Sequence, residues 1–122
     1  MSNSGENVQV NKVAVIGAGS WGTAIAGVLS GKGQRTVLWG HNPQHVKLLE
    51  RERENIKYLP GFSFPPSLEI SADLEATVSG AEIVCMVVPS HGYRAVFEQL
   101  VPFLENGVSI VSAVKGIENS SL

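Results

Sequence analysis

Short apolar runs alternate with segments of helical periodicity along most of this chain. Runs rich in Val, Ile and Leu occupy residues 13–16, 36–39, 83–88 and 108–114, and such runs are typical of strands covered on both faces of a sheet. Between the last two runs, apolar residues recur at the spacing of one helix face from Tyr93 to Leu104. The alternation of strands and helices predicts an α/β fold with a doubly wound, mainly parallel sheet.

Turn and capping residues set the bounds of the remaining elements. A helix is expected after Gly22, ending at the glycines of residues 31–33, where a left-handed C′ residue fits. Asn42 and Pro43 predict the start of a charged helix that runs to about Glu54. Further along, the sequence predicts a proline-rich loop at 58–66 and a short strand at 67–71. Asp73 is expected to cap a brief helix, and Ser90 is expected to cap the next one. Pro102 predicts a kink or an early end of that later helix.

The segment Gly17-Ala18-Gly19-Ser20-Trp21-Gly22 joins the first predicted strand to the first predicted helix. In this setting Gly17 permits a tight turn, Gly19 lets the backbone approach a pyrophosphate, and Gly22 lets the helix pack close to the strand. Free amides at the helix start, aided by the helix dipole, would then point at the phosphates. The motif in this context predicts a Rossmann-type dinucleotide-binding domain.

The residues after the second predicted strand bear on the choice of cofactor. An Asp or Glu at this point usually binds the ribose hydroxyls of NAD, whereas this chain has Trp39-Gly40-His41-Asn42. A 2′-phosphate would meet no carboxylate there, and His41 could donate a hydrogen bond to it. The sequence thus predicts a preference for NADP(H), with NAD(H) as a possible second cofactor.

Composition limits the other classes of function. The chain has 122 residues, a hydrophobic fraction of 43% and a net charge of −2, which fit one globular domain and give no reason to expect a nucleic acid partner. No segment approaches the length of a membrane span. The polar residues 1–11 predict a flexible tail without a secretory signal, and we expect a cytoplasmic protein.

Other residue types in the sequence give no further candidate site. Cys85 lies inside an apolar run and is expected to be a buried core thiol. His45 and His91 have no partners at metal-ligand spacing, so no metal site is predicted. Neither a nucleophile elbow nor a Cys–His pair suggests covalent catalysis.

Several segments together resemble the NAD(P)-dependent glycerol-3-phosphate dehydrogenases of the bacterial type. They cover residues 12–118 in the order of that family, and the Tyr-Leu-Pro-Gly and Lys-Gly-Ile-Glu segments are the most selective. The matching pieces are residues 17–24, 38–41, Asn55, 58–61, 87–91 and 115–118.

The resemblance implies reversible reduction of dihydroxyacetone phosphate to sn-glycerol 3-phosphate with NAD(P)H, a product that feeds phospholipid synthesis. It also implies where the cofactor-binding residues would lie. Ser20 and Trp21 would lie against the pyrophosphate, His41 near the adenosine ribose, Tyr58 on the cofactor side of the cleft, and Pro89 with Ser90 beside the nicotinamide half.

Lys115 is the one candidate catalytic residue of this chain. By the resemblance it would reach both the substrate and the nicotinamide end of the cofactor. A lysine at the end of an apolar strand can also stabilise the oxyanion character of a carbonyl that is being reduced. The family often has Thr or Ser before this lysine, where the present chain has Val114.

The resemblance further implies a second, helical substrate domain beyond residues 12–122, which would make this chain a truncated dinucleotide-binding domain, inactive alone. The oligomeric state stays open, a homodimer of the full-length protein being one option. Two alternatives differ in class. One is another two-domain reductase, such as a ketopantoate reductase or a relative of 3-hydroxyacyl-CoA dehydrogenase, and the other is a non-catalytic dinucleotide-sensing module.

Overall fold

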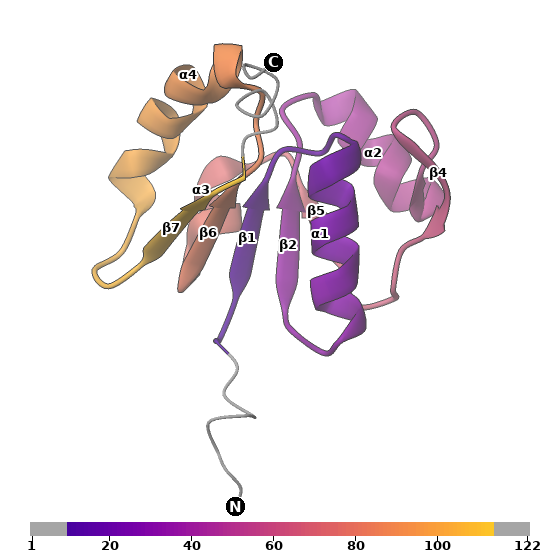
Figure 1. Ribbon diagram of the computed structural model, residues 1–122, viewed down its shortest axis with the longest axis horizontal. Coiled ribbons are helices and arrows are strands. Elements are labelled where there is room, and N and C mark those ends of the chain that lie inside the picture. The colour runs from indigo at the N-terminus through magenta and orange to yellow at the C-terminus, as the bar shows by residue number, and fades with distance from the viewer. Residues whose placement is uncertain (1–9, 114–122) are drawn as a thin grey trace, which may run out of the picture.

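The computed structural model describes residues 10–113 of the chain (Figure 1). Strands and helices alternate through most of it. In chain order they are β1 (Val13–Ile16), α1 (Ser20–Gly31), β2 (Thr36–Trp39), α2 (Pro43–Glu52), β3 (Glu54–Asn55), β4 (Leu59–Ser63), β5 (Glu69–Ser71), α3 (Leu74–Val78), β6 (Ile83–Met86), α4 (Ser90–Leu100), a 3₁₀ turn (Val101–Phe103) and β7 (Ser109–Ser112).

The main sheet has the strand order β5-β2-β1-β6-β7, and every pairing in it is parallel. The doubly wound parallel sheet predicted from the sequence is therefore confirmed. The chain proceeds outward from β1 through β2 to β5 and then returns to the other side of β1 with β6. Ile16 is in register with both Trp39 and Met86, so β1, β2 and β6 end level with one another. Ligands of such sheets bind at this carboxyl edge, where the strand order reverses.

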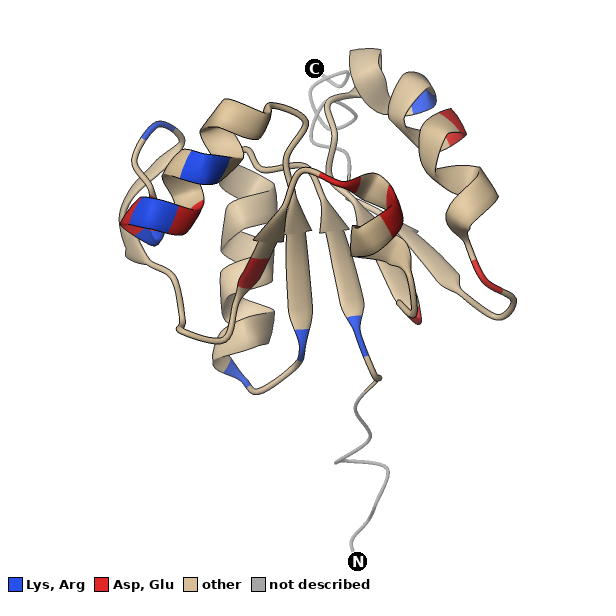
Figure 2. Ribbon diagram, turned by 180° about the vertical axis from the view of Figure 1, so that it is seen from behind, with Lys and Arg blue, Asp and Glu red and all other residues tan. Residues whose placement is uncertain are grey.

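Each face of the sheet has its own hydrophobic core. One core contains Val15 and Leu38 and is covered by α1 and α2, and the other contains Ile16 and Met86 and is covered by α3 and α4. On α2, Val46 and Leu49 are buried as expected. Figure 2 shows that the charged residues occur on the helices, the connecting segments and the strand ends. The sheet centre is thus apolar on both sides.

The helix starts are set by residues of the predicted kind in two of three cases. The Asn42 side chain accepts hydrogen bonds from the amides of Gln44 and His45, and Asp73 accepts one from Ala76. The prediction for Ser90 is wrong, because α4 already begins at that residue and no side chain caps it. Pro102 ends α4 early, as one of the two predicted options.

Residues 58–66 differ from the predicted loop. Part of this segment is strand β4, which pairs antiparallel with β3 to form a small separate sheet, the β3–β4 hairpin. Arg53 precedes it with a positive φ of 54°, and its guanidinium donates to the carbonyl oxygens of Pro65 and Leu68. These contacts with a distant turn hold the hairpin. The loop predicted from the local proline content is therefore wrong for this part of the segment.

The last strand also differs from expectation. β7 covers four residues of the predicted run 108–114, and all four are exposed rather than buried. Among the strands of residues 10–113, it lies at the edge of the sheet with β6 as its one neighbour.

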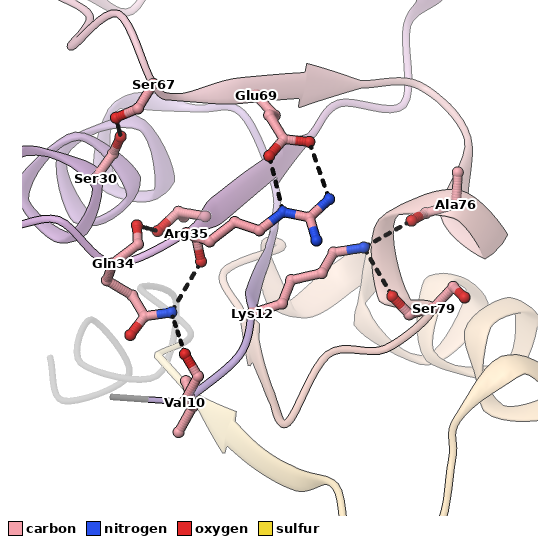
Figure 3. A network of polar contacts seen from close by, with 10 residues as sticks. Val10, Lys12, Ser30, Gln34, Arg35, Ser67, Glu69, Ala76 and Ser79 are labelled. Carbon is pink, nitrogen blue, oxygen red and sulfur yellow. Dashed lines mark hydrogen bonds and ion pairs between the residues drawn. The ribbon is translucent and has the colours of Figure 1, made fainter. Parts of the chain in front are cut away.

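The amino edge of the sheet is closed by a polar network (Figure 3). The Lys12 ammonium is buried and donates to the carbonyl oxygens of Ala76 and Ser79, at 2.9 and 2.8 Å, where helix α3 ends. Burial, followed by the charge of Arg35, lowers the pKa of Lys12. Arg35 itself pairs with the exposed Glu69 at 3.0 Å. The Lys12 ammonium and the Arg35–Glu69 pair therefore have their polar partners within this edge of the sheet.

The Cys85 thiol is buried in strand β6, as the sequence predicts. Burial raises its pKa above the ordinary value of 9.0, and both effects keep the reactive thiolate scarce. At pH 8 we expect Ellman's reagent to label the folded chain at least about tenfold more slowly than the same chain in denaturant. Equal rates in the two states would contradict this placement.

Among residues 10–113, none of the helices is long and apolar enough to cross a membrane.

Candidate functional site

A cleft of about 850 Å³ opens at the carboxyl edge of the sheet. Its walls come from four parts of the chain that the topology brings together: the glycine-rich loop after β1, the turn after β2, the β3–β4 hairpin and the start of α4 (Figure 1). The level ends of β1, β2 and β6 form its floor. The position matches the expected ligand edge of an open α/β sheet.

The glycine-rich loop is held by two close backbone contacts. Gly17 has a φ of 129°, and a Cβ there would lie 2.8 Å from the carbonyl oxygen of Val87. A Cβ on Gly22 would lie 1.9 Å from the carbonyl oxygen of Gly17. No real side chain fits at such distances, so the first and third glycines are required by the packing of the loop itself.

Gly19 differs from both of these glycines. Its φ of −83° is open to any residue, and a Cβ there would meet no atom of the described chain within 4 Å. The fold alone therefore does not require glycine at this position. The space beside Gly19 belongs to the cleft, where a Cβ would obstruct a ligand that approaches the backbone.

Helix α1 begins at the same point without a side-chain cap. The amides of its first turn have no intrahelical acceptors, as in any α-helix, and Ser20, Trp21 and Gly22 all line the cleft. A helix start that is left uncapped at a cleft is suited to an anionic group such as a phosphate.

The cleft is lined by basic side chains and by no acidic ones in the part that the structure describes. Its described lining contains no Asp or Glu, and its basic side chains are three histidines and one lysine: His41, His45, Lys57 and His91. The absence of a carboxylate at the end of β2, predicted from the sequence, thus extends to all the described lining. Such a lining favours a ligand with several negative charges.

Asn55 connects the walls of the cleft and is completely buried. Its amide nitrogen donates to the carbonyl oxygen of Ala18 at 3.0 Å and to the Thr23 hydroxyl at 2.8 Å. Its amide oxygen accepts from the backbone amide of Tyr58 at 3.2 Å and lies 3.3 Å from Nε2 of His45. One side chain thus joins the glycine-rich loop, helix α1, the hairpin and helix α2.

This network also fixes the tautomer of His45. A carbonyl oxygen can only accept and a backbone amide can only donate, so the Asn55 amide has one possible orientation. Its oxygen therefore faces His45, whose Nε2 must carry a hydrogen. The His45 ring in turn meets the Tyr58 ring edge-on, with centroids 5.6 Å apart.

Eight of the ten predicted cofactor-binding residues line this one cleft. They are Gly17, Gly19, Ser20, Trp21, Gly22, His41, Tyr58 and Pro89. Trp21 and Tyr58 are half exposed there, so two large aromatic side chains are open to a ligand. Ser90 is not among the lining residues, and Lys115 lies outside the described residues.

Sequence reasoning gave no site role to several residues of the cleft. Lys57 lies between β3 and β4, just before the segment 58–66 that the sequence predicts as a loop. His45 and His91 were considered only as metal ligands. Asn55 entered only through the family resemblance. Its position three residues before Tyr58 is the one signal that could have pointed to it, since asparagine commonly accepts bonds from nearby backbone amides. Among residues 10–113, no cluster of three or more His, Cys, Asp or Glu side chains could hold a metal ion.

Comparisons with known proteins identify the family of the chain. Residues 12–122 match the family model described as the NAD-dependent glycerol-3-phosphate dehydrogenase N-terminus. The chain is 57% identical over 110 residues to a glycerol-3-phosphate dehydrogenase [NAD(P)+] of Desulfotalea psychrophila, covering 90% of this chain and 32% of that protein. A relative of the same name from Mannheimia succiniciproducens is 42% identical, with 94% and 34% covered.

A solved structure of glycerol-3-phosphate dehydrogenase from Coxiella burnetii has the same fold. It superposes with a TM-score of 0.83 at 37% identity, over 87% of this chain and 33% of that one. The chain thus spans about a third of the length of the curated relatives it matches. With its fold, its glycine-rich loop and its matched residues in agreement, this chain belongs to the family of NAD-dependent glycerol-3-phosphate dehydrogenases, in the part that forms their N-terminus.

Proposed function

We propose that the cleft binds a nicotinamide dinucleotide. The observation that carries the proposal is the open space beside Gly19 at the uncapped start of α1. The packing of the fold does not require glycine there, whereas a pyrophosphate close to the backbone does. Ser20 and Trp21 would lie along that pyrophosphate, and their amides would donate to its oxygens.

The proposed reaction of the full-length protein is the reversible reduction of dihydroxyacetone phosphate to sn-glycerol 3-phosphate. When bound, the reduced nicotinamide supplies the hydride. The chain's own residues orient the dinucleotide between the glycine-rich loop and the hairpin, with Pro89 forming the wall beside the nicotinamide half. The product would serve phospholipid synthesis in the cytoplasm, and the full-length protein could act as a homodimer. Membership of the family supports this assignment.

We infer a preference for NADP(H) over NAD(H) from the end of β2. His41 is exposed there, lines the cleft and has no carboxylate beside it in the described lining. We expect His41→Ala to weaken NADPH binding by roughly tenfold or more, as for loss of one hydrogen bond to a charged group. NADH binding should hardly change. Fluorescence titrations of both variants with both nucleotides measure this, and an unchanged NADPH preference would remove His41 from the explanation.

Lys115 is proposed to assist the chemical step. Its ammonium would stabilise the negative charge that develops on the substrate carbonyl oxygen during reduction. In the full-length protein, Lys115→Ala should lower kcat by about a hundredfold or more while leaving NADPH affinity nearly unchanged. Steady-state kinetics and a cofactor titration separate the two effects, and normal turnover would end this proposal.

Residues 12–122 are proposed to form the dinucleotide-binding domain, with the substrate pocket completed by a helical domain. Catalysis requires the substrate and a proton donor to be positioned together with the cofactor. The 122-residue chain should therefore bind the cofactor without reducing dihydroxyacetone phosphate. Measurable turnover by the purified chain would contradict the proposal that a helical domain is needed to complete the substrate pocket.

A further inference from the structure

We propose that Lys57 is a phosphate ligand of the dinucleotide, held at the cleft by neighbouring side chains of the hairpin and of helix α2. We call Lys57, Tyr58, Asn55 and His45 together the hairpin corner. The inference rests on the proposed cofactor binding and adds to it a residue that lies outside the glycine-rich loop. The group that Lys57 would bind is a phosphate oxygen, which belongs either to the pyrophosphate or to a 2′-phosphate.

Lys57 has the position that such a role requires. It lines the cleft, and its ammonium lies 5.0 Å from the centre of the Tyr58 ring, over the ring face. This cation–π contact favours side-chain conformations that keep the charge beside the cleft. Within residues 10–113, the ion pairs are Arg35–Glu69 and Arg51–Glu52, so Lys57 has no carboxylate partner there.

The nearest acidic residue in sequence does not neutralise Lys57. Glu54 belongs to the same hairpin, and one of its carboxylate oxygens accepts from the backbone amide of Gly61 at 2.8 Å. That carboxylate is therefore bonded toward Gly61, and it forms no ion pair with Lys57 among the described residues. Because the described lining of the cleft contains no acidic side chain, the Lys57 charge is available to a ligand.

Tyr58, whose ring lies beneath the Lys57 ammonium, is held in place by two contacts. The backbone amide of Tyr58 donates to Asn55, and its ring packs edge-on against His45. The same Asn55 side chain donates to Ala18 in the glycine-rich loop. The hairpin corner is thus tied directly to the proposed pyrophosphate site, and Lys57 lines the same cleft as that loop.

The test compares Lys57→Gln with the wild-type chain, using NADPH and NADH as separate probes. Lys57 is exposed, so the substitution should leave stability within about 0.5 kcal/mol of wild type. Lys47→Gln is the matched control, because Lys47 is an exposed lysine on α2 that does not line the cleft. Lys57→Arg keeps the charge and should retain most of the affinity.

We expect Lys57→Gln to raise the Kd for NADPH by roughly tenfold at low salt, with the difference shrinking at high salt. An equal loss for NADH assigns Lys57 to the pyrophosphate, and a loss confined to NADPH assigns it to the 2′-phosphate. Wild-type affinity of Lys57→Gln for both nucleotides would overturn the inference alone. A wild-type chain that bound neither nucleotide would overturn the proposed function as well.

Discussion

A chain with Gly22→Ala is expected to lose both dinucleotide binding and much of its stability. Gly→Ala inside a helix normally stabilises by about 1 kcal/mol, but here the added Cβ would lie 1.9 Å from the carbonyl oxygen of Gly17. That atom belongs to the backbone, so helix α1 must move away from the glycine-rich loop. Overpacking of this kind costs roughly 3 kcal/mol, which denaturant unfolding would measure.

Two other glycines serve as controls for this substitution. Gly31 is the last residue of α1, and a Cβ there would make only an ordinary contact with Pro65 at 3.8 Å, so Gly31→Ala should not destabilise the chain and should leave binding unchanged. Gly19→Ala should leave stability nearly unchanged and still weaken nucleotide binding, since the new methyl group would project into the cleft. If Gly22→Ala unfolded at the wild-type denaturant concentration, the close packing of loop and helix would be wrong.

Asn55→Leu is the second substitution with a large expected effect. Leucine has a similar volume, but it leaves the Ala18 carbonyl, the Thr23 hydroxyl and the Tyr58 amide without their buried partner. Each buried polar group left without a hydrogen bond costs about 1–3 kcal/mol, so we expect a loss of at least roughly 3 kcal/mol. The hairpin should also separate from the glycine-rich loop, which would weaken NADPH binding.

The matched control is Asn106→Leu, at an exposed position in a turn on the opposite edge of the sheet. It should stay within about 0.5 kcal/mol of wild type. Asn55→Asp offers a sharper comparison, because the carboxylate keeps the shape of the amide but cannot donate to Ala18. Wild-type stability of both Asn55 variants would show that the buried network contributes little.

The parts of the fold that could be predicted from the sequence are those in which the signal is local. The start of α2 at Asn42–Pro43 and that of α3 at Asp73 depend on a side chain that caps its own helix. The spacing of Gly17, Gly19 and Gly22 likewise places a loop between one strand and one helix. In these segments neighbouring residues contain nearly all the information.

The parts that could not be predicted depend on residues far apart in sequence. The hairpin that contains strand β4 is held by Arg53, which takes a left-handed conformation and bonds to the turn at 65–68. No local sequence pattern predicts that contact. The role of Lys57 follows only from the hairpin, and that of Asn55 only from the place where Ala18 lies. Exposure of β7 depends on its position at the sheet edge, which the apolar run alone does not reveal.

The most direct test of the central claim is a calorimetric titration of the wild-type chain with NADPH, repeated with Gly19→Val. The account predicts saturable binding of one NADPH per wild-type chain, and little or no binding to the variant although it unfolds at the wild-type temperature. Heats of injection no larger than those of buffer for the wild-type chain, or equal affinity in a folded Gly19→Val chain, would contradict it.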